Sequence, residues 1–217
     1  MGAQIFKSAW RTVKQSDESL TQSLSINSVE IPISLSYFDE IFLRPQAKYI
    51  YPLKEQSECL LLPLSGAIDF ISGNLEGFVH IGQLQIIASE QTSTCVISNP
   101  YPDDTVHFLA IQQPTSSNKS SLSAFDLSKT NQIIPIATNS LCSLSIGMFE
   151  GRADDTYRLS SDENTLMVFV IRGAFEFQNR LLEAGDTLIL DQTHAAEFEA
   201  LSNNALLLFI ENFTSKK

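Results

Sequence analysis

The sequence Glu58-Cys-Leu-Leu-Leu-Pro-Leu-Ser-Gly-Ala-Ile-Asp-Phe70 has a counterpart later in the chain, Thr165-Leu-Met-Val-Phe-Val-Ile-Arg-Gly-Ala-Phe-Glu-Phe177. Each copy is an apolar run of strand length, then a Gly-Ala turn, then a segment in which apolar and acidic residues alternate as in a strand. A second pair follows in the same order, Gly82-Gln-Leu-Gln-Ile-Ile87 and Gly185-Asp-Thr-Leu-Ile-Leu190. Two landmarks repeated in the same order predict a duplicated β unit.

The rest of the chain also consists of short strand patterns separated by polar turns, and helical periodicity is not sustained anywhere. Short strands at regular spacing are typical of β-barrels and sandwiches. The 217 residues are enough for two units of about 100 residues each. The Ser-rich stretch 112–121 is the best linker. We therefore predict an all-β protein with an amino-terminal barrel over residues 1–113, a linker over 114–125 and a carboxy-terminal barrel over 126–217.

Charge and cysteine usage restrict the partners. The formal net charge of -11 argues against direct contact with nucleic acid or anionic membranes, which attract basic surfaces. The three cysteines, Cys59, Cys95 and Cys142, are widely spaced, which argues against a disulfide framework or a Cys-x-x-Cys metal site. Apolar runs reach only about seven residues, too short for a membrane span. These features predict a protein of the reducing cytoplasm whose partners are small molecules or proteins.

The repeated landmarks resemble those of a cupin, in which a strand ending in glycine is followed by a hairpin, a Pro-Gly-Asp-like turn and an apolar strand. That turn is Glu183-Ala-Gly-Asp186 in the second half and the diverged His80-Ile-Gly-Gln83 in the first. With two such units in tandem, the chain is similar to pirin-like bicupins, and in particular to bacterial pirins associated with quercetin dioxygenase activity. The resemblance implies two double-stranded β-helix (jelly-roll) barrels.

The resemblance also implies a place for a metal. In this family the amino-terminal cupin holds one ion, typically iron, through a His-x-His pair, a later His and a Glu two residues beyond it. Counting from Gly66 and Gly82 places these positions at Pro52, Lys54, Cys95 and Ile97. Pro and Ile cannot coordinate a metal, and a protonated Lys repels one. The expectation is therefore a protein without a metal cofactor.

Five residues near these positions are candidates for lining a pocket in the first barrel: Tyr51, Lys54, Glu58, Cys95 and His107. Facing inward, Lys54 would hold an anionic ligand or pair with Glu58, whereas facing outward it is an ordinary surface lysine. A substitute metal cage of Cys95, His107 and Glu58 is the alternative to a structural strand histidine and a buried apolar cysteine.

These residues favour a binding protein over an enzyme. The main hypothesis is a pirin-like bicupin that is non-catalytic or metal-free and binds a small molecule or a protein. The alternative is a metal-dependent oxygenase like quercetin 2,3-dioxygenase that uses an altered site, with a metal-independent lyase or isomerase using Lys54 and Glu58 as a further version. Fold similarity alone does not decide between them.

Overall fold

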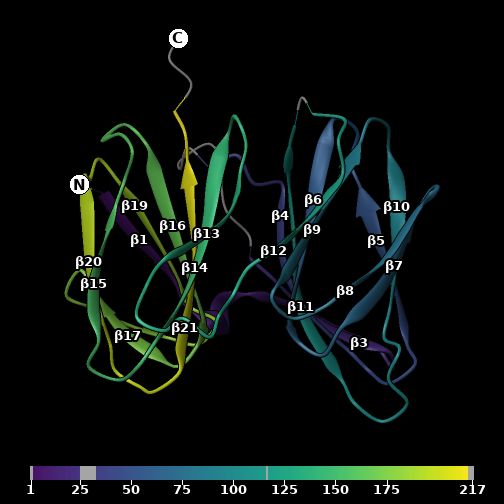
Figure 1. Cartoon of the computed structure of the whole chain (residues 1–217), viewed down its shortest axis with the longest axis horizontal. Coiled ribbons are helices and arrows are strands. Elements are labelled where there is room, and N and C mark those ends of the chain that lie inside the picture. Colours follow the sequence, from purple (N-terminus) through teal and green to yellow (C-terminus); the bar gives the residue numbers. More distant parts are fainter. Residues whose placement is uncertain (1, 25–32, 116, 215–217) are drawn as a thin grey trace. The chain divides into compact units, whose positions relative to one another are not determined.

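The computed structural model describes residues 2–24, 33–115 and 117–214. Strands dominate it, and one short 3₁₀ helix, η1 (Ser8–Trp10), is its helical element in the described part. The chain divides into two compact units (Figure 1). We call residues 11–24 and 34–124 the first barrel, and residues 2–10 and 125–214 the second barrel. The predicted all-β, tandem-barrel fold is confirmed.

The first barrel consists of a seven-stranded and a four-stranded antiparallel sheet. The larger sheet has the order β12-β9-β6-β11-β4-β3-β2 and the smaller one the order β5-β10-β7-β8. The strands are β2 (Thr12–Gln15), β3 (Ser19–Ser23), β4 (Tyr37–Leu43), β5 (Lys48–Leu53), β6 (Ser57–Ser65), β7 (Ile68–Ser72), β8 (Leu75–Val79), β9 (Gln83–Ser89), β10 (Ser93–Ser98), β11 (Val106–Pro114) and β12 (Ser121–Ala124).

The second barrel repeats this plan. Its larger sheet has the order β1-β19-β16-β21-β14-β13 and its smaller sheet the order β15-β20-β17-β18. The strands are β1 (Gly2–Phe6), β13 (Ile134–Thr138), β14 (Cys142–Phe149), β15 (Asp154–Arg158), β16 (Thr165–Arg172), β17 (Ala174–Phe177), β18 (Arg180–Glu183), β19 (Thr187–Asp191), β20 (Ala195–Ala200) and β21 (Ala205–Asn212).

Two edge strands alter the predicted boundaries. β1 lies in the segment assigned by sequence to the amino-terminal barrel, but it pairs antiparallel with β19, from Gly2 opposite Asp191 to Phe6 opposite Thr187. β12 lies within the predicted linker 114–125 and pairs with β9. The sequence prediction therefore needs correction at both places: residues 2–10 belong to the second barrel, and the first barrel continues to Ala124.

Gly66 and Gly173, which occupy equivalent places in the two repeated sequences, are required for the same structural reason. Gly66 (φ 74°) and Gly173 (φ 85°) both occupy the left-handed region, which favours glycine. A Cβ at Gly66 would lie 2.7 Å from a methyl group of Val106, and one at Gly173 would collide with Ser202. The turn between the two strands of each phrase therefore requires glycine for both its backbone angle and its packing.

The strand pairings align the two barrels residue by residue. Tyr51 is opposite Cys95 in the first barrel, as Tyr157 is opposite Ala196 in the second. Asp39 is opposite Ala110, as Ser145 is opposite Phe209. The repeat seen in the sequence is thus a repeat of ladder register, and the positions that differ can be compared directly.

In the described part of the chain, no helix has both the length and the apolar character needed to cross a membrane.

Candidate functional site: a pocket in the first barrel

A pocket of about 480 Å³ opens into the first barrel. This volume lies in the range of small-molecule sites. β2, β3, β4, β5 and the segment before β4 line it, through Thr12, Lys14, Thr21, Ser23, Leu24, Leu35, Ser36, Tyr37, Phe38, Asp39, Tyr49, Tyr51 and Pro52. Hydroxyl groups and aromatic rings dominate this lining, and Lys14 and Asp39 are its charged members.

The pocket contains a buried tyrosine–carboxylate pair. The hydroxyl of Tyr51 donates to Oδ2 of Asp39 at 3.0 Å and also lies 3.4 Å from the carbonyl oxygen of Ala110. Burial, with smaller contributions from Cys59 and Asp39, raises the pKa of Tyr51 far above its ordinary value. Tyr51 is therefore a neutral hydrogen-bond donor that fixes the orientation of the Asp39 carboxylate.

Alternation along β5 decides which side chains face the barrel interior. Tyr51 and Leu53 belong to the core cluster and Tyr49 packs against it, whereas Pro52 and Lys54 are exposed. On β10, Cys95 and Ile97 are in the core, opposite Tyr51 and Tyr49 respectively.

Counting along the sequence therefore found the inward positions of β10 but the outward positions of β5. The residues that face one another inside the barrel are Tyr49 and Tyr51 on β5 and Cys95 and Ile97 on β10.

These four side chains do not fit a divalent metal ion. Burial raises the pKa of the Cys95 thiol to about 12, so the thiol remains protonated, and Tyr51 remains a neutral phenol. Ile97 has no donor atom. Across the described residues, no group of three or more His, Cys, Asp or Glu side chains could hold a metal ion.

Lys54 is not in the pocket lining. It follows β5 and is exposed, with its ammonium 4.4 Å from the ring centroid of Tyr37, a cation–π contact. Because Tyr37 does line the pocket, Lys54 contributes a positive charge next to one wall.

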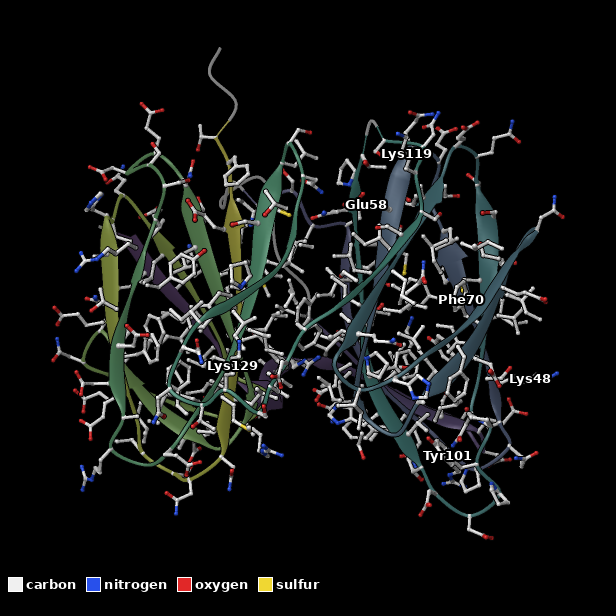
Figure 2. The ribbon with its side chains drawn as sticks, in the orientation of Figure 1. Lys48, Glu58, Phe70, Tyr101, Lys119 and Lys129 are labelled. Carbon is white, nitrogen blue, oxygen red and sulfur yellow. The ribbon has the colours of Figure 1, made fainter. Side chains whose placement is uncertain are left out.

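Glu58 points away from the barrel interior. Its neighbours Cys59 and Leu61 belong to the core cluster, so Glu58 occupies the opposite face of β6. It is buried there and accepts a hydrogen bond of 2.6 Å from Nε2 of Gln113. Figure 2 shows Glu58 on β6 and Phe70, a member of the core cluster, on β7. Glu58 therefore does not line the pocket, and of the two alternatives for Lys54 the structure has the exposed lysine and not the pair with Glu58.

His107 also lies on the outward face, since Val106 and Phe108 are its core-facing neighbours on β11. Its Nε2 is 2.8 Å from Oε1 of Glu40, and its ring stacks on Phe42 with centroids 4.1 Å apart. Glu40 also accepts a hydrogen bond from Nη1 of the buried Arg11. Burial raises the pKa of Glu40, but the hydrogen bond from His107 and the charge of Arg11 outweigh it and lower the pKa overall.

Of the five predicted pocket residues, Tyr51 and Cys95 thus lie in the barrel interior. Lys54, Glu58 and His107 do not. The cage of Cys95, His107 and Glu58 does not form, because Cys95 faces the interior from the small sheet, whereas His107 and Glu58 lie on the outward face of the large sheet. Sequence reasoning missed Asp39, Lys14 and Tyr49. The signal for Asp39 was present: an acidic residue at period two with Ile41 and Leu43 on one strand is expected to face the core.

The second barrel has a related tyrosine–carboxylate pair with different surroundings. The hydroxyl of Tyr157 donates to Oε2 of Glu211 at 3.1 Å, while the other oxygen accepts from the backbone and hydroxyl of Ser160 and from Asn164. The ring of Tyr157 stacks on Phe209 at 5.0 Å. Glu211 is therefore saturated with protein donors.

The two barrels have the fold of a tandem cupin. Residues 127–211 match the family model described as the quercetinase C-terminal cupin domain. The second barrel thus carries this domain, and the predicted resemblance to pirin-like bicupins is confirmed. No curated protein sequence matches the chain.

Several solved structures have the same fold. The bacterial pirin YhhW of Escherichia coli in complex with nickel(II) superposes with a TM-score of 0.82 at 15% identity, over 96% of this chain and 98% of that one. GK1651 of Geobacillus kaustophilus gives a TM-score of 0.77 at 12% identity, over 99% and 96%. A quercetin 2,3-dioxygenase of Acinetobacter baumannii gives 0.73 at 10% identity, over 96% and 78%. At sequence identities of 10–15%, these comparisons show that the chain shares the fold of these proteins.

Proposed function

We propose that this pirin-like bicupin is a metal-free binding protein that holds a small molecule in the pocket of the first barrel. The observation that carries this proposal is the chemistry of the interior positions on β5 and β10. Tyr49, Tyr51, Cys95 and Ile97 face one another there, and together they offer phenols, a protonated thiol and an alkyl group.

The same pocket has the properties of a ligand site. It is concave, of suitable volume, and combines apolar and aromatic walls with a few oriented polar groups. Its floor is pre-organised, because the Tyr51 hydroxyl holds Asp39 in place before a ligand arrives. In this proposal the barrel provides the pocket, and hydrogen-bonding side chains such as Asp39 bind the ligand where a metal ion would otherwise do so.

Metal analysis of protein purified without chelators tests the proposal. We expect far less than one equivalent of iron, nickel, copper or manganese, and no increase in thermal stability when these ions are added. A stably bound metal would raise the melting temperature by mass action. Near-stoichiometric metal, or oxygen uptake with flavonols in metal-supplemented protein, would instead favour an oxygenase that uses an altered site.

A further inference from the structure

We infer that the pocket of the first barrel is selective for small aromatic carboxylic acids that carry a hydrogen-bond donor, such as a phenolic hydroxyl, at the opposite end from the carboxylate. This inference rests on the proposed function and names the class of ligand. It is carried by the distribution of charge and hydroxyl groups over the pocket walls.

One wall suits a carboxylate. β2 and β3 contribute the ammonium of Lys14 and the hydroxyl group of Thr21, which stand opposite each other in the ladder and can both donate hydrogen bonds. Ser23 is opposite Asp39 instead, and Thr12 is opposite Ser23. Lys14 is exposed, so it presents its charge at the open side of the pocket. Hydrogen bonds from a cation to a carboxylate are stronger than those between neutral groups.

The floor suits a donor instead. Asp39 is buried and accepts from Tyr51 on Oδ2. A carboxylate has about four lone-pair positions, so Asp39 retains capacity for a ligand hydroxyl or amine. A ligand carboxylate placed against Asp39 would instead be repelled. The polarity of the pocket therefore fixes the orientation of an acid, with its donor end toward Asp39 and its anionic end toward Lys14.

The space between these ends favours a flat ring. Tyr37 on β4 and Tyr49 on β5 both line the pocket, and aromatic side chains provide extensive contact area for planar ligands. The positive charge of Lys54 lies on Tyr37, and Lys48 lines an adjoining groove together with Lys14 and Glu18. In a chain with a net charge of -11, three lysines in or beside this pocket give an anion a local route of approach.

The test compares three probes by titration calorimetry with the full-length protein: 4-hydroxycinnamate, its methyl ester, which lacks the charge, and cinnamate, which lacks the hydroxyl. We expect 4-hydroxycinnamate to bind several-fold more tightly than either control compound. Raising the salt concentration should weaken the two acids and leave the ester unchanged, because salt screens the attraction to Lys14.

Two substitutions assign the two ends. Lys14→Met should weaken both acids roughly fivefold and leave the ester unchanged. Asp39→Asn keeps an acceptor for Tyr51 but presents an amide to the ligand, so it should weaken 4-hydroxycinnamate and its ester but not cinnamate. Lys119→Met is the matched control, since Lys119 is an exposed lysine of the same barrel that does not line the pocket (Figure 2).

Equal affinity for the acid and its ester, an effect of Lys14→Met on all three probes, or no binding of any probe would overturn the inference. Binding of the ester alone would overturn it while leaving the proposed metal-free binding function in place. Stoichiometric metal in the purified protein would contradict the proposed metal-free function, whatever the affinities of the three probes. The metal analysis and the titrations therefore test the function and the ligand class separately.

Discussion

The two barrels share one ladder register but fill it differently. In the second barrel the tyrosine of the small sheet packs on Phe209, within a cluster that also includes Phe177 and Phe198. In the first barrel, Ala110 occupies the position equivalent to Phe209, and Asp39 occupies the position equivalent to Ser145. The hydroxyl of Tyr51 donates a hydrogen bond to this Asp39. One barrel thus uses the shared scaffold for an aromatic core, and the other uses it for a polar pocket.

The largest effect that separates them is expected at Phe209. Phe209→Ala should destabilise the second barrel by about 3–5 kcal/mol, because it removes a buried ring and leaves a cavity beside Tyr157. Denaturant unfolding measures this change. Leu181→Ala, at an exposed position of β18, is the control and should change stability little. A loss below about 1 kcal/mol for Phe209→Ala would show that the aromatic cluster is not what holds this barrel.

The outward face of the first barrel provides the next contrast, since Glu40 and His107 occupy the positions of Ile146 and Leu206 in the second. Glu40→Gln should cost about 3 kcal/mol, because it leaves the buried charge of Arg11 without its carboxylate. Glu76→Gln, an exposed change on β8, should be close to neutral in the same unfolding measurement.

This contrast also predicts a pH dependence. The pKa of Glu40 is lowered below its ordinary value of 4.5, so its stabilisation is complete above that pH and is lost as the pH falls through the folded-state pKa. Melting temperatures of the wild type and Glu40→Gln should therefore converge below about pH 4.5. A constant difference down to pH 3 would contradict this account.

A smaller difference is expected between the two tyrosines. Tyr51→Phe should cost about 1 kcal/mol, because it removes the donor that orients the buried Asp39. Tyr157→Phe should cost about half as much, since Glu211 keeps its hydrogen bonds from Ser160 and Asn164. Thermal unfolding of the two variants side by side measures the difference, and the reverse order would break the comparison.

The smallest effect lies on the outer faces of the small sheets. In the second barrel, Glu199 stands opposite both Asp154 and Glu176. Glu176→Lys should therefore stabilise by about 0.5 kcal/mol, because like charges in directly opposite positions destabilise a sheet. Glu76→Lys is the matched control in the first barrel, where Glu76 is opposite Ile71 and gains no such relief. Equal effects of the two substitutions would exclude cross-strand repulsion as the cause.

The duplication, the glycine turns and the tandem-barrel fold could be predicted from sequence because each leaves a local pattern. The interior of the first barrel could be predicted only in part. Counting from Gly66 over an intervening turn gave the wrong parity on β5, and a shift of one residue exchanges the inner and outer faces. The pairing of Tyr51 with Cys95 fixes which residues of β5 face inward, and it joins residues far apart in the chain.

The pairing of β1 with β19 has a consequence for dividing the molecule. A fragment that begins at residue 126 lacks β1, and the backbone groups of β19 that face β1 would then be open to another copy. The first barrel has the reverse arrangement, because β12, which covers β9, follows the rest of that barrel in sequence. In each barrel, the strand that follows the second glycine landmark (β9 or β19) is thus covered by an edge strand from outside the repeated part of the sequence (β12 or β1). An isolated second barrel should remain soluble only when residues 2–10 are fused to it or supplied as a peptide.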